Sequence, residues 1–386
     1  MSDTIDTIDT KGKKNTPDIK VNILKYKPHD GINFGEIKLE LSGKDMDISL
    51  VNSFRRTCEK NIPTIAIPRG LIKIIKNTAV AYDNDYMKQR LRFLPIFDNK
   101  LDIDPKLDYL PEKYWKGITD ADYINLVRPI HPNEKKIEIL IDVTNDTKDI
   151  MVVDTNHEGF QVFVDNFNVN MYNKDHPCLI IELKPKESFI CSLMAVLGTG
   201  NEDKKNQWNS CTNTCHYYEG TTEIPAIVCL RACATLDPHD ICIRACNNMI
   251  HKTHLIKNII LEKIKQFDNM DGQYEIILDN EDSTMGEFLN SEFQRIKDFV
   301  SGVMIPDKLI RSVTIKQEMF GDTSVKRFKK IVDEVFSRAV IRLETLRNVI
   351  NNAKSKDNKD NKDNKDNKNN KNNKNNKNNK NNKTKK

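Results

Sequence analysis

The sequence predicts an α+β fold in which two similar modules pair with each other inside one chain. Strand and helix patterns follow one another in the order strand, helix, strand, long helix, and this order occurs twice along the 386 residues. A short polar segment, 267–272, separates the two cycles. A β-rich insert, 99–176, interrupts the first cycle, and a Lys/Asn-rich tail, 351–386, follows the second.

The first module is predicted in two parts, 19–98 and 177–266, after a polar segment, 1–18, that we expect to be disordered. Alternating apolar residues at 37–41 indicate a strand with one buried face. Over 47–60 the apolar residues recur at spacings of three and four, which indicates a helix.

The insert and the second part of the first module contain several strand patterns. β-branched and aromatic residues cluster at 137–143 and 160–169, and again at 179–196, where two strands flank a Lys-Pro-Lys-Glu turn. Another strand is expected at 226–236. Asp237 and Pro238 then have the residue types of an N-cap and a first helical position, so a long helix should run from there to about residue 266.

The second module, 273–350, begins with a strand at 274–278. A capping-box pattern at 284–287 predicts the start of a helix. A strand at 309–316 precedes a long helix over 325–350, whose apolar residues form a continuous seam. Neither long seam has a partner in its own module, so we expect the two seams to pack together. The residues predicted for this internal pairing are Met249, Ile256, Ile260, Met285, Leu289, Val332, Ala339, Leu343 and Leu346.

The charge is divided unevenly between body and tail. The tail holds 13 Lys and 4 Asp and carries +9, whereas residues 1–350 carry −4. A nucleic-acid-binding domain has a clear basic excess, so direct DNA or RNA binding is not expected of the folded part. From Lys356 the tail offers nothing apolar to bury. It is predicted to be disordered, either as a merely solvated tract or as a weak electrostatic tether for nucleic acid.

No catalytic residue and no cofactor site is predicted. The sequence has no Gly-rich phosphate loop and no Asp-Xaa-Asp-Xaa-Asp motif for magnesium. The favoured interpretation is that the chain has no metal site. Cys211, Cys215 and His216 are zinc candidates, but weak ones, because their spacing differs from Cys-Xaa₂-Cys. Cys242 and Cys246 lie on the apolar seam, where cysteine behaves as a small hydrophobe.

Nothing in the sequence indicates a membrane or secreted protein. No run approaches 18 apolar residues, and 1–14 lacks the apolar stretch of a signal peptide. We therefore expect a reducing compartment, in which the nine cysteines are mostly free thiols.

The motifs of the first module follow one another in a characteristic order. The first motif is Val-Asn-Ser-Phe-Arg-Arg at 51–56, and the second is Pro-Thr-Ile-Ala at 63–66. The third is Gln-Arg-Leu-Arg-Phe-Leu-Pro-Ile at 89–96. The fourth begins with Gly-Thr-Gly at 198–200 and ends with Trp208. Together they resemble the bacterial alpha family of RNA polymerase subunits, which includes the eukaryotic third-largest subunit and the archaeal D-type polypeptide. Phe54 replaces the usual Leu, and the last motif is stretched and lacks its His-Ala.

The second module resembles a smaller relative of the same family. Asn-Glu-Asp-Ser-Thr-Met-Gly at 280–286 and Ile-Pro-Asp-Lys-Leu at 305–309 are similar to motifs of the eleventh eukaryotic subunit and of its archaeal L-type counterpart. Ser283 and Asp307 depart from the family pattern. A fused pair with a Lys/Asn-rich tail most resembles the polymerase subunit of giant DNA viruses of the Mimivirus type.

The resemblance implies two alpha-like dimerisation modules and a role as a non-catalytic assembly platform of a DNA-dependent RNA polymerase. Its expected partners are the two large catalytic subunits and small subunits, with Asn52, Arg55 and Arg56 as contact residues. A merely solvated face is the alternative for the two arginines. The expected location is the virion and host cytoplasm if the chain is viral, and otherwise the nucleus or cytosol. The competing function is a nucleic-acid-binding regulator that acts through the basic tail.

Overall fold

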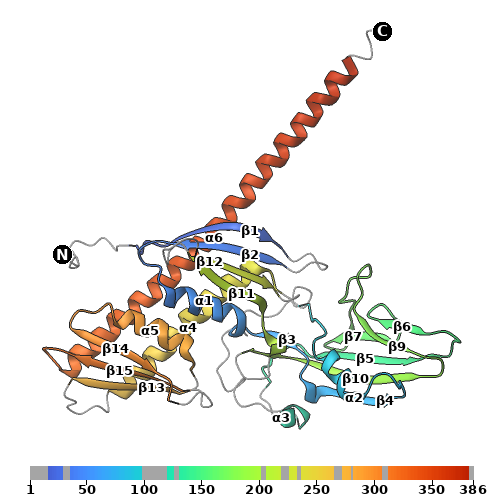
Figure 1. Ribbon diagram of the computed structural model, residues 1–386, viewed down its shortest axis with the longest axis horizontal. Helices are drawn as coiled ribbons and strands as arrows, with labels where there is room; N and C mark the ends of the chain where they lie inside the picture. The colour runs from blue at the N-terminus through green and yellow to red at the C-terminus, as the bar shows by residue number, and fades with distance from the viewer. Residues whose placement is uncertain are drawn as a thin grey trace.

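The fold mixes helices with four antiparallel sheets (Figure 1). The computed structural model describes residues 16–28, 35–97, 120–125, 130–200, 206–218, 226–232, 236–264, 272–279, 281–306 and 312–381. Predictions for the segments between them, such as the Asp307 turn and the break at 267–271, lie outside the described residues.

A four-stranded sheet joins the first and last strands of the first half. Its order is β1 (Lys20–Lys27), β2 (Glu36–Ser42), β12 (Ala226–Ala232) and β11 (Cys211–Tyr218). The alternation at 37–41 corresponds to β2, in which Ile37, Leu39 and Leu41 have no exposed surface. This buried face packs on helices, because alternate side chains of a strand point to one side.

Three helices cover that sheet. They are α1 (Ile48–Lys60), α4 (Pro238–Ile264) and α6 (Val325–Asn381), and α4 lies beside the N-terminal part of α6 (Figure 1). The predicted helix over 47–60 and the predicted long helices from 238 and 325 are thus present within one to three residues of their expected ends, except at the end of α6.

The end of α6 differs from the expectation. The helix continues to Asn381, through the repeat for which we predicted disorder, and extends away from the rest of the molecule (Figure 1). An α-helix makes its backbone hydrogen bonds within the chain, so the helical backbone can continue past the last apolar residue of the seam.

The second half forms a smaller sheet with one helix. Strands β13 (Gln273–Asp279), β15 (Ser312–Met319) and β14 (Phe299–Met304) pair in that order, and α5 (Ser283–Phe293) lies beside them. Strand β14 was not predicted from the sequence. The capping assignment at Thr284 is wrong: Asp282 is the N-cap, and its carboxylate accepts a hydrogen bond from the Thr284 N–H at 2.8 Å.

A six-stranded sheet holds the rest of the described chain. Its order is β3 (Thr64–Ala66), β10 (Ser188–Gly198), β5 (Ile137–Thr144), β7 (Phe160–Val164) and β8 (Phe167–Asn168), with β4 (Ile72–Asn77) also paired to β10. Beside it, β6 (Met151–Asp154) pairs with β9 (Leu179–Leu183). Short helices α2 (Asn84–Leu91) and α3 (Asp120–Ile124) complete this part.

Two large apolar cores follow from this arrangement. One joins the four-stranded sheet, all four longer helices and the three-stranded sheet, so it contains residues from both halves of the chain. The other lies at the six-stranded sheet, where β10 pairs with β5 and side chains from 65–96 pack with side chains from 137–197. Strands from within 99–176 and from outside it therefore share one core.

Candidate assembly interface

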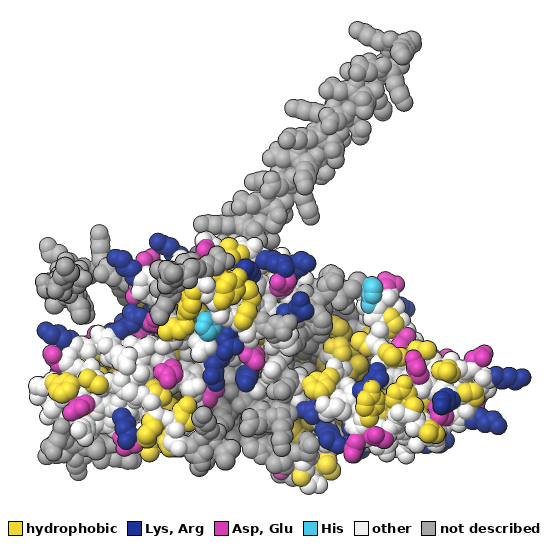
Figure 2. All heavy atoms as spheres, in the orientation of Figure 1, with side chains coloured by type: hydrophobic (Ala, Val, Ile, Leu, Met, Phe, Trp, Pro, Cys, Tyr) yellow, Lys and Arg dark blue, Asp and Glu magenta, His cyan; other side chains and the backbone are white. Residues whose placement is uncertain are grey.

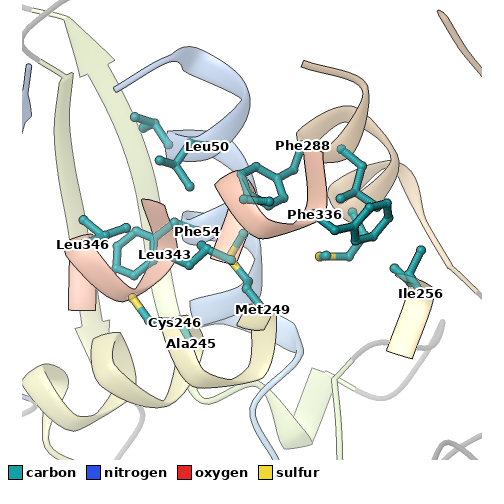
Figure 3. Packing of buried hydrophobic residues seen from close by; sticks show 14 of the residues in the cluster. Leu50, Phe54, Ala245, Cys246, Met249, Ile256, Phe288, Phe336, Leu343 and Leu346 are labelled. Carbon is teal, nitrogen blue, oxygen red and sulfur yellow. The ribbon is translucent and has the colours of Figure 1, made fainter. Parts of the chain in front are cut away.

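The long helices α4 and α6 pack against each other through apolar side chains (Figure 3). All nine residues predicted for internal pairing lie in the core shared by the two halves, and none is more than 2% exposed. Leu50 and Phe54 of α1 join them, with no exposed surface (Figure 3). Burying one such side chain contributes about 1.5–3 kcal/mol, so this seam is a principal source of stability.

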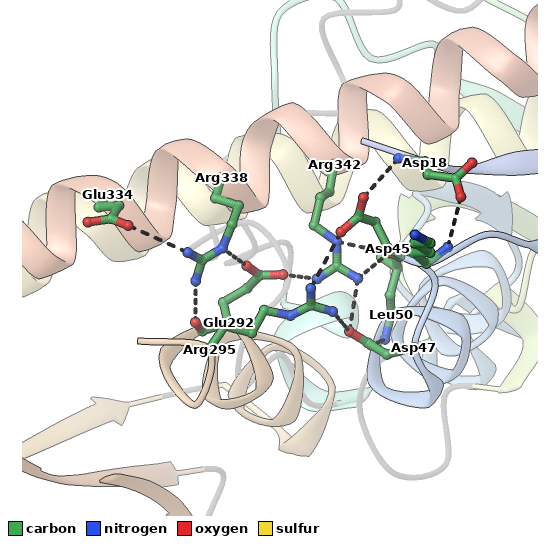
Figure 4. A network of polar contacts seen from close by, with 10 residues as sticks. Asp18, Asp45, Asp47, Leu50, Glu292, Arg295, Glu334, Arg338 and Arg342 are labelled. Carbon is green, nitrogen blue, oxygen red and sulfur yellow. Dashed lines mark hydrogen bonds and ion pairs between the residues drawn. The ribbon is translucent and has the colours of Figure 1, made fainter. Parts of the chain in front are cut away.

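A network of charged side chains lies beside the seam (Figure 4). Arg342 of α6 is 1% exposed and forms an ion pair with Glu292 of α5, which has no exposed side-chain surface. The same guanidinium donates to the Asp47 carboxylate at 2.9 Å and to the Asp45 backbone carbonyl at 3.1 Å. Arg342 therefore links the second half of the chain to the segment that leads into α1.

Two more arginines complete the network. Arg338 Nε donates to Glu292 at 2.8 Å, and Arg295 donates to Asp47 at 2.7 Å (Figure 4). A buried charge is tolerated only when opposite charges and hydrogen bonds surround it, and here carboxylates and guanidinium groups alternate. Because these groups come from α6, α5 and the segment before α1, the network specifies how the two halves fit together.

Asp47 belongs to the charge network and is also the N-cap of α1. Its carboxylate accepts a hydrogen bond from the Leu50 N–H at 2.8 Å. Burial alone would raise the pKa of Asp47, but the charge of Arg342 and the hydrogen bond from Leu50 outweigh it, so the pKa lies below its ordinary value. The carboxylate is thus held in its charged form at the junction.

Helix α1 also contacts the N-terminus of α5 directly. The Ser53 hydroxyl donates to the buried Thr284 carbonyl at 2.7 Å, and Arg56 Nη2 donates to Asp282 at 3.2 Å. Asp282 therefore caps α5 and pairs with an arginine of the other half. Burial would raise the pKa of Asp282, but hydrogen bonds from Thr284 and the charge of Arg56 lower it overall.

Arg55, Arg56 and Asn52, the predicted partner contacts, all make contacts inside the chain. Arg55 donates to Asn52 at 3.1 Å, to Glu59 at 3.2 Å and to the Thr214 hydroxyl of β11 at 3.3 Å. The two arginines still retain 19% and 33% of their side-chain exposure, respectively. The two guanidinium groups therefore have partners within the chain and keep part of their surface exposed, and a role toward a partner stays a prediction.

The weak zinc candidates do not converge. Cys211 is buried and its thiol donates to the Cys58 carbonyl at 3.0 Å, whereas Cys215 is exposed. His216 follows Cys215 in β11, so the two side chains point to opposite faces of the sheet. Among the described residues, only Asp237, His239 and Asp240 have three potential ligand atoms within 4.8 Å of one another.

That acidic cluster at the start of α4 already contains a cation from the protein. Lys354 Nζ of α6 lies 3.4 Å from one Asp237 oxygen, and the Tyr26 hydroxyl donates to the other at 2.7 Å. Burial, together with the Asp237 carboxylate, raises the pKa of Tyr26. The cluster therefore connects β1, α4 and α6. Asp237 and Lys354 lie too far apart along the sequence for their spacing to indicate this contact.

A second grouping of cysteines was also not predicted from the sequence. Cys58 of α1 and Cys242 of α4 are buried, and their thiols interact; burial raises the pKa of Cys58 strongly. Protonated thiols in such a site pack as small hydrophobes. Cys242 and Cys246 behave in this respect as their place on the seam indicated.

The described part of the chain thus combines α-helices with antiparallel β-sheets, and its two halves share one core and one buried charge network. Within those residues, no helix is both long and apolar enough to cross a bilayer. No protein-family model matches the sequence. The chain is similar to a protein of Acanthamoeba polyphaga mimivirus that is named as a putative DNA-directed RNA polymerase subunit, R470. The two are 25% identical over 344 residues, which cover 85% of this chain and 92% of that protein.

Proposed function

We propose that this chain is a non-catalytic assembly-platform subunit of a multisubunit DNA-dependent RNA polymerase. In this proposal its two halves are alpha-like dimerisation modules, 19–98 with 177–266 and 273–350, which pair within one chain. The observation that carries it is the single core and the buried Arg342 network that both halves build. The extended similarity to R470 supports the polymerase role.

A preassembled pair presents one fixed composite surface. Its apolar faces are buried against each other, so they are not free to bind elsewhere. Figure 2 shows Lys and Arg side chains, among acidic and apolar ones, on the face where Figure 1 places α1, and this outer side of α1 is the surface that the pair would offer to other subunits. Joining the halves in one chain replaces a bimolecular encounter with an intramolecular one, at an effective concentration on the order of millimolar.

The contact surface that we propose for a large subunit is the α1 group of Asn52, Arg55 and Arg56. Internal bonds to Glu59, Thr214 and Asp282 hold the guanidinium groups in fixed orientations while leaving part of each exposed. A guanidinium offers five donors, so it can keep these bonds and still donate to a partner carboxylate. Preorganisation of this kind reduces the entropy lost on binding. If the chain is viral, the complex would assemble in the host cytoplasm and enter the virion.

Affinity purification tests both parts of the proposal. Tagged full-length chain, expressed in its native source, should co-purify the two large polymerase subunits, identified by mass spectrometry. Arg55→Glu should reduce their yield at least about tenfold, because like charges at an interface cost several kcal/mol. Arg69→Glu is the matched control, since Arg69 pairs with Asp85 at the surface of another part of the chain.

Each outcome bears on a different part of the proposal. A wild-type chain that brings down no large subunit would contradict the polymerase role itself. Equal yields from the Arg55 and Arg69 variants would leave the role standing and remove α1 from the contact surface. Thermal melting of each purified variant distinguishes a lost contact from a lost fold.

A further inference from the structure

Cys215 and Cys229 face each other across two neighbouring strands. β11 pairs antiparallel with β12, and in their register Cys215 lies directly opposite Cys229. Residues in such positions have Cβ atoms about 4.5–5.5 Å apart. A disulfide spans about 3.5–4.5 Å between Cβ atoms, so a small adjustment of the two strands brings the pair into bonding range.

The surroundings of the pair leave it open to reagents. β11 is an edge strand of the four-stranded sheet, Cys215 is exposed and Cys229 is half-buried. Burial and the neighbouring Cys215 thiol raise the pKa of Cys229, and Lys38, opposite Cys229 on β2, opposes that rise.

The other cysteines that the structure describes lack this combination. Cys58, Cys191, Cys211, Cys242 and Cys246 are buried, and Cys178, although partly exposed, lies outside the strands and faces no cysteine in a ladder. Sequence spacing groups Cys215 with Cys211, whereas the sheet register groups it with Cys229.

We propose that Cys215 and Cys229 form a reversible dithiol–disulfide site, oxidised by small-molecule disulfides such as glutathione disulfide. The exposed Cys215 thiolate attacks one sulfur of glutathione disulfide, forms a mixed disulfide and releases one glutathione thiolate. The Cys229 thiolate then attacks the Cys215 sulfur and releases the second glutathione. Two protein thiols are oxidised, one glutathione disulfide is reduced to two glutathione molecules, and these take up the two protons.

The bond would tie edge strand β11 covalently to the body of its sheet. β11 also carries Thr214, whose hydroxyl and carbonyl accept hydrogen bonds from Arg55. Oxidation would therefore fix the strand that orients Arg55. This consequence rests on the proposed function, whereas the thiol chemistry does not.

Thiol counting on the folded full-length chain tests the site. After incubation with glutathione disulfide and removal of the excess, the wild-type chain should have lost two of its nine thiols, titrated in denaturant. Non-reducing peptide mapping should find the Cys215 and Cys229 peptides joined, and dithiothreitol should restore all nine thiols. Cys215→Ser should form no internal disulfide, whereas Cys178→Ser, the matched control, should still lose two thiols.

Three results would overturn the site: a wild-type chain that keeps all nine thiols, a disulfide between other cysteines, or a Cys215 bond that joins two chains. Because Cys215 is exposed, its serine variant should fold normally, and an unchanged melting temperature verifies this. Cys229→Ser provides an independent second variant with the same expected loss of the linked peptides. None of these readouts depends on polymerase binding.

Discussion

Arg342 and Glu292 form an ion pair with almost no access to solvent. Removing one member of such a pair leaves the other charge buried in the core without its partner. Arg342→Met should therefore lower the free energy of unfolding by about 3 kcal/mol, even though methionine fills much of the same volume. Urea unfolding measures the loss. Lys330→Met, an exposed position on the same helix, should change stability by less than about 0.5 kcal/mol.

A loss of stability for Arg342→Met no greater than that for Lys330→Met would mean that the charge network adds nothing beyond packing.

No sequence pattern predicts the charge network. An arginine next to Leu343 in a helix is normally interpreted as part of the solvated face, and Glu292 precedes an apolar Phe293 in the same way. Which charges become buried depends on how α5, α6 and the segment before α1 meet, and that is a property of tertiary packing.

The depressed pKa values of Asp47 and Asp282 predict an acid-sensitive interface. A carboxyl group with a lowered folded-state pKa stabilises the fold above its unfolded pKa, about 3.9, and this contribution is lost as pH falls through the folded value. The wild-type chain should therefore lose stability steeply below about pH 4. Urea midpoints measured across that range report the loss.

Two variants make the pH prediction specific. Asp47→Asn should be less stable than wild type at neutral pH, and its midpoint should fall less on acidification, because asparagine still caps α1 but cannot titrate. Asp146→Asn, at an exposed site, is the control and should follow the wild-type curve. Parallel curves for wild type and Asp47→Asn would show that Asp47 does not couple to folding.

In the Gly-to-Trp motif, Gly198 allows the side chain of Trp208 to approach the backbone closely. A Cβ at this position would lie 2.6 Å from the indole of Trp208, and Trp208 Nε1 donates to the Val196 carbonyl at 3.0 Å. In the Gly-to-Trp motif the ring therefore packs directly on the backbone. Its residues could be picked out from the sequence, but their contact depends on how Trp208 packs on β10, which is a property of tertiary structure.

At the scale of elements, helices were predictable and sheet partners were not. The 3.6-residue periodicity of α1, α4 and α6 is a local property, so their positions followed from the sequence. Strand β14 contains Gly302 and a weak alternation, and it was missed. The pairing of β10 with β5, which joins the insert to the strands around it, involves residues about fifty apart and has no local signature.

Truncation of α6 tests which part of the helix stabilises the fold. Ile350 is the last residue of the helix in the shared core, and Lys354 contacts Asp237. A chain that ends after Lys354 should keep the wild-type melting temperature, because the sequence beyond it has no apolar residue to bury. A chain that ends after Arg342 loses Leu343, Leu346 and Ile350, and should unfold or melt far below the wild type.

A drop of several degrees for the longer truncated chain would show that residues beyond Lys354 contribute to the fold. Equal melting temperatures for both truncated chains would show that the C-terminal part of the seam is dispensable. Circular dichroism of the chain that ends after Lys354 also reports how much of the helical signal comes from the Lys/Asn repeat.

At the scale of the whole molecule, the two halves contribute to one core and should depend on each other. Residues 1–268 expressed alone would expose the seam of α4, and residues 271–386 would expose the seam of α6, each a large apolar face. We therefore expect each half to be poorly soluble alone. Co-expressed, they should form a soluble one-to-one complex, measured by size-exclusion chromatography with light scattering.

The co-expressed complex also distinguishes specific packing at the α4–α6 seam from non-specific apolar association. Leu343 has no exposed surface, whereas Ile341, two residues earlier on α6, is 42% exposed. Leu343→Asp places an unpaired charge in the core, at a cost of several kcal/mol, and should abolish the complex. Ile341→Asp makes a similar chemical change at the surface and should leave it intact. Halves that are soluble and monomeric when separate would refute the pairing, since independent domains need no partner to bury their apolar faces.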